Sequence, residues 1–236
     1  MIMLDARVSS IEYRVSSIEY RESSMAKYPI FLDLNGRRVV IIGGGTVATR
    51  KAETILGTGA RLVVVAPRLD DTLRKVCAGT KAELIESKYS KDYIGGATLV
   101  IAATNDEALN GQIYKDCQQL EILCNVVDSP ALCDFYVPAV VQRGDLQIAV
   151  GTGGKSPAYA GHLRKKLENI FTDKHGEFLE HLEAIRGFII EKTADTTQRK
   201  AIMGKLTDDE SFEYFLQKGP EQWRKRAEEI INCGDR

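Results

Sequence analysis

The sequence predicts an α/β fold: a Rossmann-like, doubly wound parallel sheet, followed by a short β segment and a helical C-terminal part. Between residues 38 and 127, short apolar runs alternate with segments of helical spacing. Two further apolar runs flank Arg143-Gly144-Asp145, and helical patterns continue from Pro157 onward. Alternation of strands and helices is typical of a parallel sheet that is covered by helices on both faces.

Five apolar runs are expected to form the sheet. The first is short and continuous, which is typical of a strand that is buried on both faces, and the third is weaker. The runs are residues 38–42, 62–65, 83–85, 98–102 and 122–127. Helices are expected over 46–56 and 105–119, the second with Asn105 or Asp106 near its N-cap.

The pattern changes after about Pro138. Runs at 137–141 and 146–150 predict a hairpin, and Ser156-Pro157 predicts the start of a helix. Further helices are expected over 208–217 and 220–232. An amphipathic helix before these two is predicted by an apolar stripe of Phe178, Leu182, Ile185 and Ile189.

Composition excludes several classes of protein. The 236 residues are 44% hydrophobic and 28% charged, as in ordinary globular domains, so a sizeable core is expected. The net charge of -1 argues against a nucleic-acid partner that is bound through bulk charge. No apolar run reaches the roughly 18–20 residues that span a bilayer, and the N-terminus lacks a signal core, so we expect a cytoplasmic protein with no membrane partner. Five cysteines without a C-x-x-C pair indicate reduced thiols.

The first residues contain a perfect repeat. Residues 8–14 read VSSIEYR and residues 15–21 read VSSIEYR again. A coiled coil needs three or four heptads, and this segment offers two. We therefore expect a disordered leader over residues 1–24, with Met25 opening the folded part.

A glycine motif directly follows the first expected strand. Gly43-Gly44-Gly45-Thr46-Val47-Ala48 fits G-x-G-x-x-A, a variant of the dinucleotide-binding fingerprint. In this pattern Gly43 permits the tight turn, Gly45 lets the backbone approach a pyrophosphate, and Ala48 allows close helix–strand packing. We expect these residues to bind the cofactor, the alternative being a glycine turn without a ligand.

The second strand lacks the acidic residue that usually binds the ribose hydroxyls. It ends in Val65-Ala66-Pro67-Arg68. Arg68 would suit the 2′-phosphate of NADP, although an exposed Arg after a strand is also often only solvated. The residues alone therefore leave the choice between NAD and NADP open.

Several motifs in order resemble one known family, the N-terminal module of siroheme synthases. These modules are precorrin-2 dehydrogenases, and some are also sirohydrochlorin ferrochelatases. The matching residues are 28–34 (YPIFLDL), 39–51 (VVIIGGGTVATRK), 101–106 (IAATND), 124–128 (CNVVD), Phe135, Pro138 and 153–157 (GGKSP).

The resemblance implies a homodimer with three parts. We expect an NAD-binding domain over residues 25–137, a central dimerisation segment over 138–167 and a helical domain over 168–236. It also implies oxidation of precorrin-2 to sirohydrochlorin with NAD⁺, and in bifunctional members insertion of Fe²⁺ to give siroheme. Larger siroheme synthases carry a methyltransferase domain as well, so the 236 residues are expected to be a stand-alone form.

Asp128 is the expected catalytic residue. It follows the fifth strand, and ligands of open α/β sheets bind at that edge. A carboxylate near the nicotinamide can accept the proton that precorrin-2 must lose. The resemblance places the family's catalytic aspartate on Asp128, while position alone also allows an aspartate that caps the turn before Ser129-Pro130. Thr104 and Asn105, after the fourth strand, are expected to contact the ribose or nicotinamide side of the cofactor.

The substrate implied by the resemblance is a polycarboxylate, which cations and backbone N–H groups would bind. Thr152-Gly153-Gly154-Lys155, before a helix N-terminus, is the expected cradle, with Lys155 as the best charged candidate. Arg143 and Arg164 are weaker candidates, and a flexible hinge is the alternative reading of the glycines. The run 164–166 is expected to be a solvated helix face.

No His/Cys cluster has metal-ligand spacing, so iron is expected as a substrate without a permanent protein metal site. Glu177 and His181 are expected on a solvated helix face, with His162 and His175 structural or exposed. Two alternatives remain: a non-catalytic nucleotide-sensing module and a chelatase that works without NAD⁺.

Overall fold

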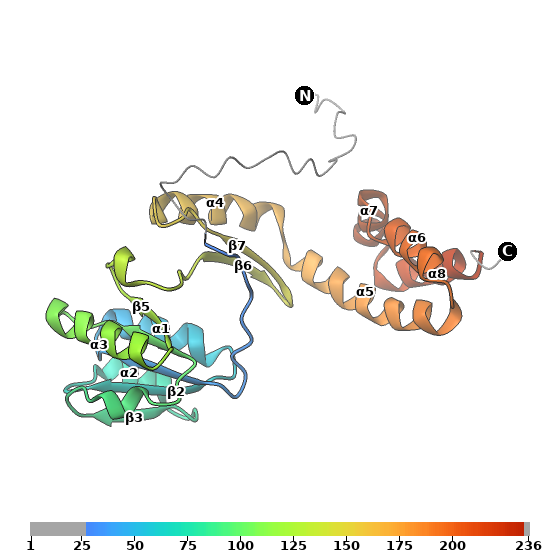
Figure 1. Cartoon of the computed structure of the whole chain (residues 1–236). Helices are drawn as coiled ribbons and strands as arrows, with labels where there is room; N and C mark the ends of the chain where they lie inside the picture. The colour runs from blue at the N-terminus through green and yellow to red at the C-terminus, as the bar shows by residue number, and fades with distance from the viewer. Residues whose placement is uncertain (1–26, 234–236) are drawn as a thin grey trace, which may run out of the picture. The chain divides into compact units, whose positions relative to one another are not determined.

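Five parallel strands form the sheet of the N-terminal half (Figure 1). The computed structural model describes residues 27–233, so the expected leader with its repeat and Met25 lie outside the described residues. The strand order is β3-β2-β1-β4-β5, and every neighbouring pair is parallel. The strands are β1 (Arg38–Ile42), β2 (Arg61–Ala66), β3 (Glu83–Glu86), β4 (Leu99–Ala102) and β5 (Leu123–Val126). The predicted doubly wound sheet is confirmed, with strand ends that differ from the expected ones by at most one residue.

The order of the strands creates a switch point. The chain runs outward from β1 to β3 and then returns to β4 on the other side of β1. Ile42 at the end of β1 pairs with Ala102 at the end of β4, which in turn pairs with Val126 at the end of β5. Loops that follow β1, β4 and β5 therefore leave the same edge, where ligands of such sheets bind.

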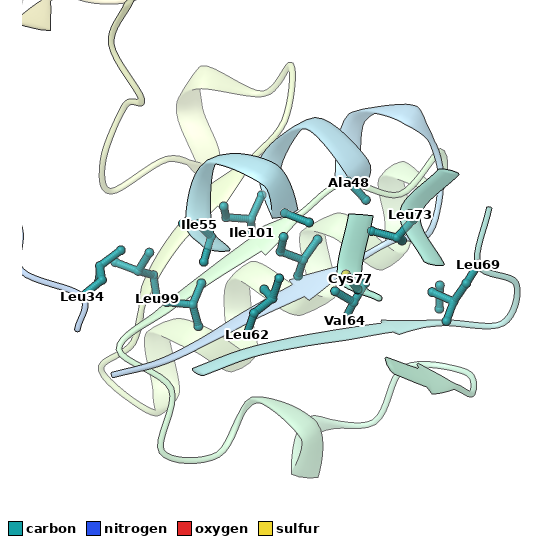
Figure 2. Close-up of a cluster of buried hydrophobic side chains, with 14 residues drawn as sticks. Leu34, Ala48, Ile55, Leu62, Val64, Leu69, Leu73, Cys77, Leu99 and Ile101 are labelled. Carbon is teal, nitrogen blue, oxygen red and sulfur yellow. The ribbon is translucent and has the colours of Figure 1, made fainter. Parts of the chain in front are cut away.

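Both faces of the sheet are buried. Along β1, Val39 and Ile41 face one hydrophobic cluster and Val40 and Ile42 face the other. The first cluster lies under helices α1 (Thr46–Leu56) and α2 (Asp71–Cys77), with Ala48 and Ile55 above Leu62 and Val64 of β2 (Figure 2). The second cluster lies under α3 (Glu107–Gln119).

Two of these helices differ from the sequence prediction. The sequence analysis did not predict α2, a helix of seven residues that buries only Leu73 and Cys77. Helix α3 begins at Glu107 rather than 105, since the Asp106 side chain accepts a hydrogen bond from the Leu109 N–H and caps the helix. Short 3₁₀ turns at Lys91–Ile94 and Pro130–Leu132 complete this half.

The predicted hairpin consists of β6 (Ala139–Arg143) and β7 (Leu146–Val150), joined through Gly144 at φ +55. Strand β6 starts after Pro138, two residues later than expected, because proline has no N–H to donate to a ladder. Five helices follow, among them the predicted helices near 208–217 and 220–232. They are α4 (Pro157–Ile170), α5 (Asp173–Lys192), α6 (Thr196–Leu206), α7 (Asp209–Lys218) and α8 (Pro220–Cys233).

Helices α5 to α8 share a separate core. Phe178, Ile185 and Ile189 of the predicted stripe are buried there with Phe215 and Trp223. The indole Nε1 of Trp223 donates to the Ser211 hydroxyl at 2.8 Å. Within residues 27–233, no helix is long and apolar enough to cross a bilayer.

His181 departs from the prediction of a solvated face. Its ring packs against Phe215 and Trp223, with centroids 5.5 and 6.4 Å away, because α7 and α8 cover this side of α5.

The expected domain limit after residue 167 falls inside α4, and from Leu32 onward the chain forms one compact unit. The domain limits stay a prediction.

Candidate functional site

The glycine loop is held by close backbone contacts. Gly43 has φ +136, and a Cβ there would lie 2.7 Å from the carbonyl carbon of Ala103. A Cβ on Gly44 would overlap the Arg68 carbonyl oxygen and lie 3.0 Å from the Ala66 Cβ. The turn expected at Gly43 is thus a strained conformation that favours glycine. The packing role of Gly44 was not predicted.

Gly45 lies on the open side of the loop. The nearest atom to a Cβ there would be Asp70 Oδ2, at 4.0 Å. Gly45 is the N-cap of α1, and no side chain caps this helix. The first-turn N–H groups therefore remain available to an anion, which the helix dipole also favours. Ala48, fully buried, allows the close packing expected of it.

An open cleft of about 1060 Å³ begins at this loop. Its walls contain every predicted cofactor residue except Ala48, which lies beneath them. They also contain residues that the sequence analysis did not select for the site. The predicted residues in the wall are Gly43, Gly44, Gly45, Thr46, Val47, Thr104 and Asn105, and the others include Asp70, Lys88, Tyr89 and Asp106. The glycine loop, the uncapped helix and the size of the cleft fit a dinucleotide.

A buried amide shapes the loop after β4. The Thr104 hydroxyl lies 2.7 Å from Asn110 Oδ1, and Asn110 Nδ2 donates to the Thr104 carbonyl at 3.0 Å. The Asp106 N–H also donates to the Thr104 hydroxyl. Thr104 is therefore engaged within the protein, while Asn105 is exposed. Asn110 was missed, although it shares the buried helix face of Ile113 and Cys117.

The cleft holds both signs of charge where the ribose of a dinucleotide would lie. Arg68 follows β2 and Lys88 follows β3, and both are exposed. The Asp70 N–H donates to the Gly44 carbonyl at 2.9 Å, which brings a carboxylate to the glycine loop. The acid that the end of β2 lacks is thus present a few residues later, at the N-cap of α2.

Tyr89 forms part of the same wall. Its hydroxyl donates to Asp116 Oδ2 at 2.9 Å. Burial raises the pKa of Tyr89, and the hydrogen bond to Asp116 raises this pKa further. Tyr89 therefore stays a neutral phenol over the whole physiological range.

Asp128 sits in a tight loop at the carboxyl edge of the sheet. The Val127 N–H donates to the Ala102 carbonyl at 2.9 Å, so Asp128 flanks the start of the loop that contains Thr104. The chain then folds back along β5, where the Asp134 N–H donates to the Cys124 carbonyl at 2.8 Å. Asp128 is exposed and has φ +61, a left-handed conformation that aspartate tolerates better than most residues.

The Asp128 carboxylate makes no hydrogen bond within residues 27–233. The N-cap of the following 3₁₀ turn is Ser129, and no side chain caps it. The geometry thus gives no support to the alternative in which Asp128 serves as a cap. Asp128 does not line the cleft itself, but its exposed carboxylate is available to a ligand at the same edge of the sheet.

The segment expected to cradle the substrate lies outside the walls of this cleft. Gly153 and Gly154 have φ +61 and +79, and the Ser156 N–H donates to the Thr152 hydroxyl. A Cβ on Gly154 would lie 3.4 Å from the Tyr136 ring. Thr152–Lys155 is therefore a defined turn with an exposed Lys155, and its role as a cradle stays a prediction.

Both weaker cation candidates are already engaged. The Arg143 guanidinium donates to the carbonyls of Phe171 and Glu168 at the end of α4 and pairs with Asp173 at 3.4 Å. Arg164 pairs with Glu168 one turn along its own helix. These arginines stabilise helix ends and faces in this structure.

The remaining histidines have structural contacts. His162 is exposed and stacks on Tyr159, while His175 Nδ1 accepts a hydrogen bond from the Thr172 N–H at the start of α5. Among residues 27–233 there is no group of three or more His, Cys, Asp and Glu side chains that could hold a metal ion.

Comparisons with known proteins agree with this geometry. The family model described as putative NAD(P)-binding matches residues 30–139. The one described as sirohaem biosynthesis protein central matches residues 143–170. The chain belongs to the siroheme synthase N-terminal module family. The first match covers the sheet and the cleft, and the second covers the end of β6, β7 and α4.

Relatives of this module are curated siroheme synthases. That of Pseudomonas fluorescens is 40% identical over 173 residues, which is 73% of this chain and 37% of the relative. That of Psychrobacter arcticus is 39% identical over 176 residues, 75% of this chain and 32% of the relative. The chain thus spans about a third of the length of these relatives.

A solved structure shares the fold of this module. It is titled SirC, precorrin-2 dehydrogenase, and superposes with a TM-score of 0.70. The alignment covers 86% of this chain and 99% of that one, at 24% sequence identity. The parallel sheet, the antiparallel hairpin and the helical region are therefore an arrangement that a solved protein also has.

Proposed function

We propose that the chain oxidises precorrin-2 to sirohydrochlorin with NAD⁺. The observation that carries this proposal is the placement of Asp128. Its carboxylate is exposed, makes no hydrogen bond within the described residues and stands at the edge of the sheet beside the loop that forms one wall of the dinucleotide cleft. Membership of the siroheme synthase family and the fold shared with a precorrin-2 dehydrogenase support this substrate.

The reaction removes a hydride and a proton from precorrin-2. Bound NAD⁺ supplies the hydride acceptor. Gly43–Val47 would hold its pyrophosphate, Asp70 its ribose hydroxyls, and Asn105 its nicotinamide side. Asp128 would accept the proton from the macrocycle, which is the work of a positioned general base.

Iron insertion is the finer proposal for the same site. Chelation must remove two pyrrole protons as Fe²⁺ enters the macrocycle; Asp128 would accept one of them, and solvent water would accept the other. Fe²⁺ would then be a substrate that passes directly into sirohydrochlorin, with Thr152–Lys155 as contacts to the carboxylates of the macrocycle.

The hairpin would mediate a homodimer. A two-stranded ribbon is marginally stable by itself, and both of its strand edges lack a partner strand within residues 27–233. One face packs on α4 through residues such as Val141, while Val140 and Ala149 pair on the exposed face. Size-exclusion chromatography with light scattering tests this proposal. A dimeric mass that Val140→Lys converts to a monomer supports it, and a monomeric wild-type chain refutes it.

Anaerobic incubation of the purified chain with precorrin-2 and NAD⁺, with and without Fe²⁺, tests the proposed reaction. We expect NADH and sirohydrochlorin without iron, and siroheme when iron is present. NADH formation without siroheme would limit the activity to the dehydrogenase step. Metal insertion into sirohydrochlorin without any NAD⁺-dependent step would instead indicate a chelatase, and NAD⁺ binding with neither product would indicate a sensing module.

A further inference from the structure

Lys51 of α1 lies beside the loop that carries Asp128. Its helix neighbours Ala48 and Ala52 are buried in the cluster against which Val127 and Phe135 pack. Lys51 itself is half-buried. Side chains on a helix lean toward its N-terminus, and the N-terminus of α1 stands at the carboxyl edge of the sheet. The ammonium group therefore extends from the helix toward the loop after β5.

The electrostatic surroundings of Lys51 agree with this proximity. Burial is the largest influence and lowers the pKa of Lys51, and the neighbouring Arg50 lowers it further. The Cys133 thiol and the Asp128 carboxylate act in the opposite direction and raise the pKa, so both are close enough to interact with the ammonium. Lys51 forms no ion pair within 4.0 Å in the described part of the chain.

A partly desolvated cation without a directly paired anion is costly for a protein. The free-energy cost of burying a charge is offset when a group of opposite charge lies next to it. The basic residues predicted as substrate contacts differ from Lys51, because Arg143 and Arg164 are engaged and Lys155 is exposed, where solvent screens its charge. Lys51 is thus the half-buried cation that an anionic ligand beside Asp128 would meet.

We propose that Lys51 binds a carboxylate of the tetrapyrrole substrate next to Asp128. This inference rests on the proposed function. A polycarboxylate brings negative charge close to the base that must remain ionised, and repulsion between them would weaken binding. Lys51 offsets that repulsion and fixes the macrocycle through one of its carboxylates, so that the carbon that loses the proton faces Asp128.

Kinetics of Lys51→Met and Lys51→Arg variants test this proposal. With saturating NAD⁺ under anaerobic conditions, we expect Lys51→Met to raise the KM for precorrin-2 about ten- to hundredfold, as loss of a hydrogen bond to a charged group does. The kcat should change little, and Lys51→Arg should recover part of the loss. The matched control is Arg50→Met, which removes an exposed positive charge from the next residue and should leave the KM within about twofold.

Binding of uroporphyrin III, a stable tetrapyrrole with eight carboxylates, separates this inference from the proposed function. Its absorbance change reports affinity without turnover, and Lys51→Met should weaken it by the same factor as the KM. If the wild type oxidises precorrin-2 but Lys51→Met leaves both the KM and the uroporphyrin affinity unchanged, the role of Lys51 is refuted and the function stands. A Lys51→Met variant with a lower kcat but an unchanged KM and uroporphyrin affinity would also refute the carboxylate-binding role of Lys51. If the wild type binds uroporphyrin through Lys51 but forms no NADH from precorrin-2, the function fails and the carboxylate site stands.

Discussion

Substitution of Gly44 by alanine tests whether the cleft depends on the close packing of the glycine loop. The new methyl group would lie 3.0 Å from the Ala66 Cβ and overlap the Arg68 carbonyl oxygen. Carbon atoms in ordinary contact are about 3.5–4.0 Å apart, so the loop or the segment after β2 must move. The neighbours are backbone and a strand residue, which cannot turn aside as a flexible side chain can.

The cost of this movement follows from the buried surroundings. Extra methyl groups in packed regions typically cost about 1–3 kcal/mol, and overlap with backbone places this one at roughly 2–3 kcal/mol. In a chain of this size each kcal/mol lowers the Tm by about 2–4 °C, so we expect a fall of roughly 4–12 °C. Displacement of the loop also removes N–H contacts to a pyrophosphate, which should weaken NADH binding at least about tenfold.

Gly45→Ala is the matched control. Its methyl group would have Asp70 Oδ2 at 4.0 Å as nearest neighbour and would extend into the open side of the loop. We expect a stability loss below about 1 kcal/mol, but weaker binding because the methyl group occupies the approach of the pyrophosphate. Thermal unfolding and NADH fluorescence titration of both variants measure the two effects. A Gly44→Ala protein with wild-type Tm and wild-type affinity would refute the reasoning.

Three further changes probe other parts of the structure. Arg68→Glu places a carboxylate at the end of β2, and we expect the ratio of kcat/KM for NADP⁺ to that for NAD⁺ to fall about tenfold or more in steady-state assays; an unchanged ratio would remove Arg68 from cofactor selection. Asn110→Ala leaves the Thr104 carbonyl without its donor, which should cost about 1–3 kcal/mol in urea unfolding and raise the KM for NAD⁺, whereas a purely local role would leave the KM unchanged. Gly176→Ala would place a Cβ 2.7 Å from the Arg143 carbonyl carbon and should lower the free energy of unfolding by about 1–3 kcal/mol. The control Gly187→Ala, in open space on the same helix, should not destabilise, and equal effects of the two would contradict this packing argument.

Local pattern predicted the sheet because its strands are buried on both faces. Val39 to Ile42 and Leu62 to Val65 are continuous apolar runs, and short runs of this kind are typical of strands in the middle of a parallel sheet. The glycine motif could also be placed, since its turn, strand and helix are consecutive in the chain. The short helix α2 was not predicted, since its seven residues are too few for a clear helical period and only two of them are buried.

The rest of the site depends on contacts between distant segments. Lys51 is a site candidate only because the chain after β5 returns beside α1, an arrangement that no local pattern contains. Arg143 was a substrate candidate by charge, yet the carbonyls at the end of α4 engage it. Asp70 lies beyond the strand end at which the dinucleotide fingerprint places an acid, and a loop brings it back to Gly45. Such positions follow from tertiary packing.

The most direct measurement for the proposed dehydrogenase is NADH formation from precorrin-2 by an Asp128→Asn variant. Asparagine also tolerates the left-handed backbone at φ +61, so the loop should be kept while the base is lost. We expect unchanged Tm and NADH affinity, with kcat lowered by about 10²- to 10⁴-fold, the usual contribution of a general base. Wild-type rates of NADH formation in this variant would contradict the assignment of Asp128 as the base.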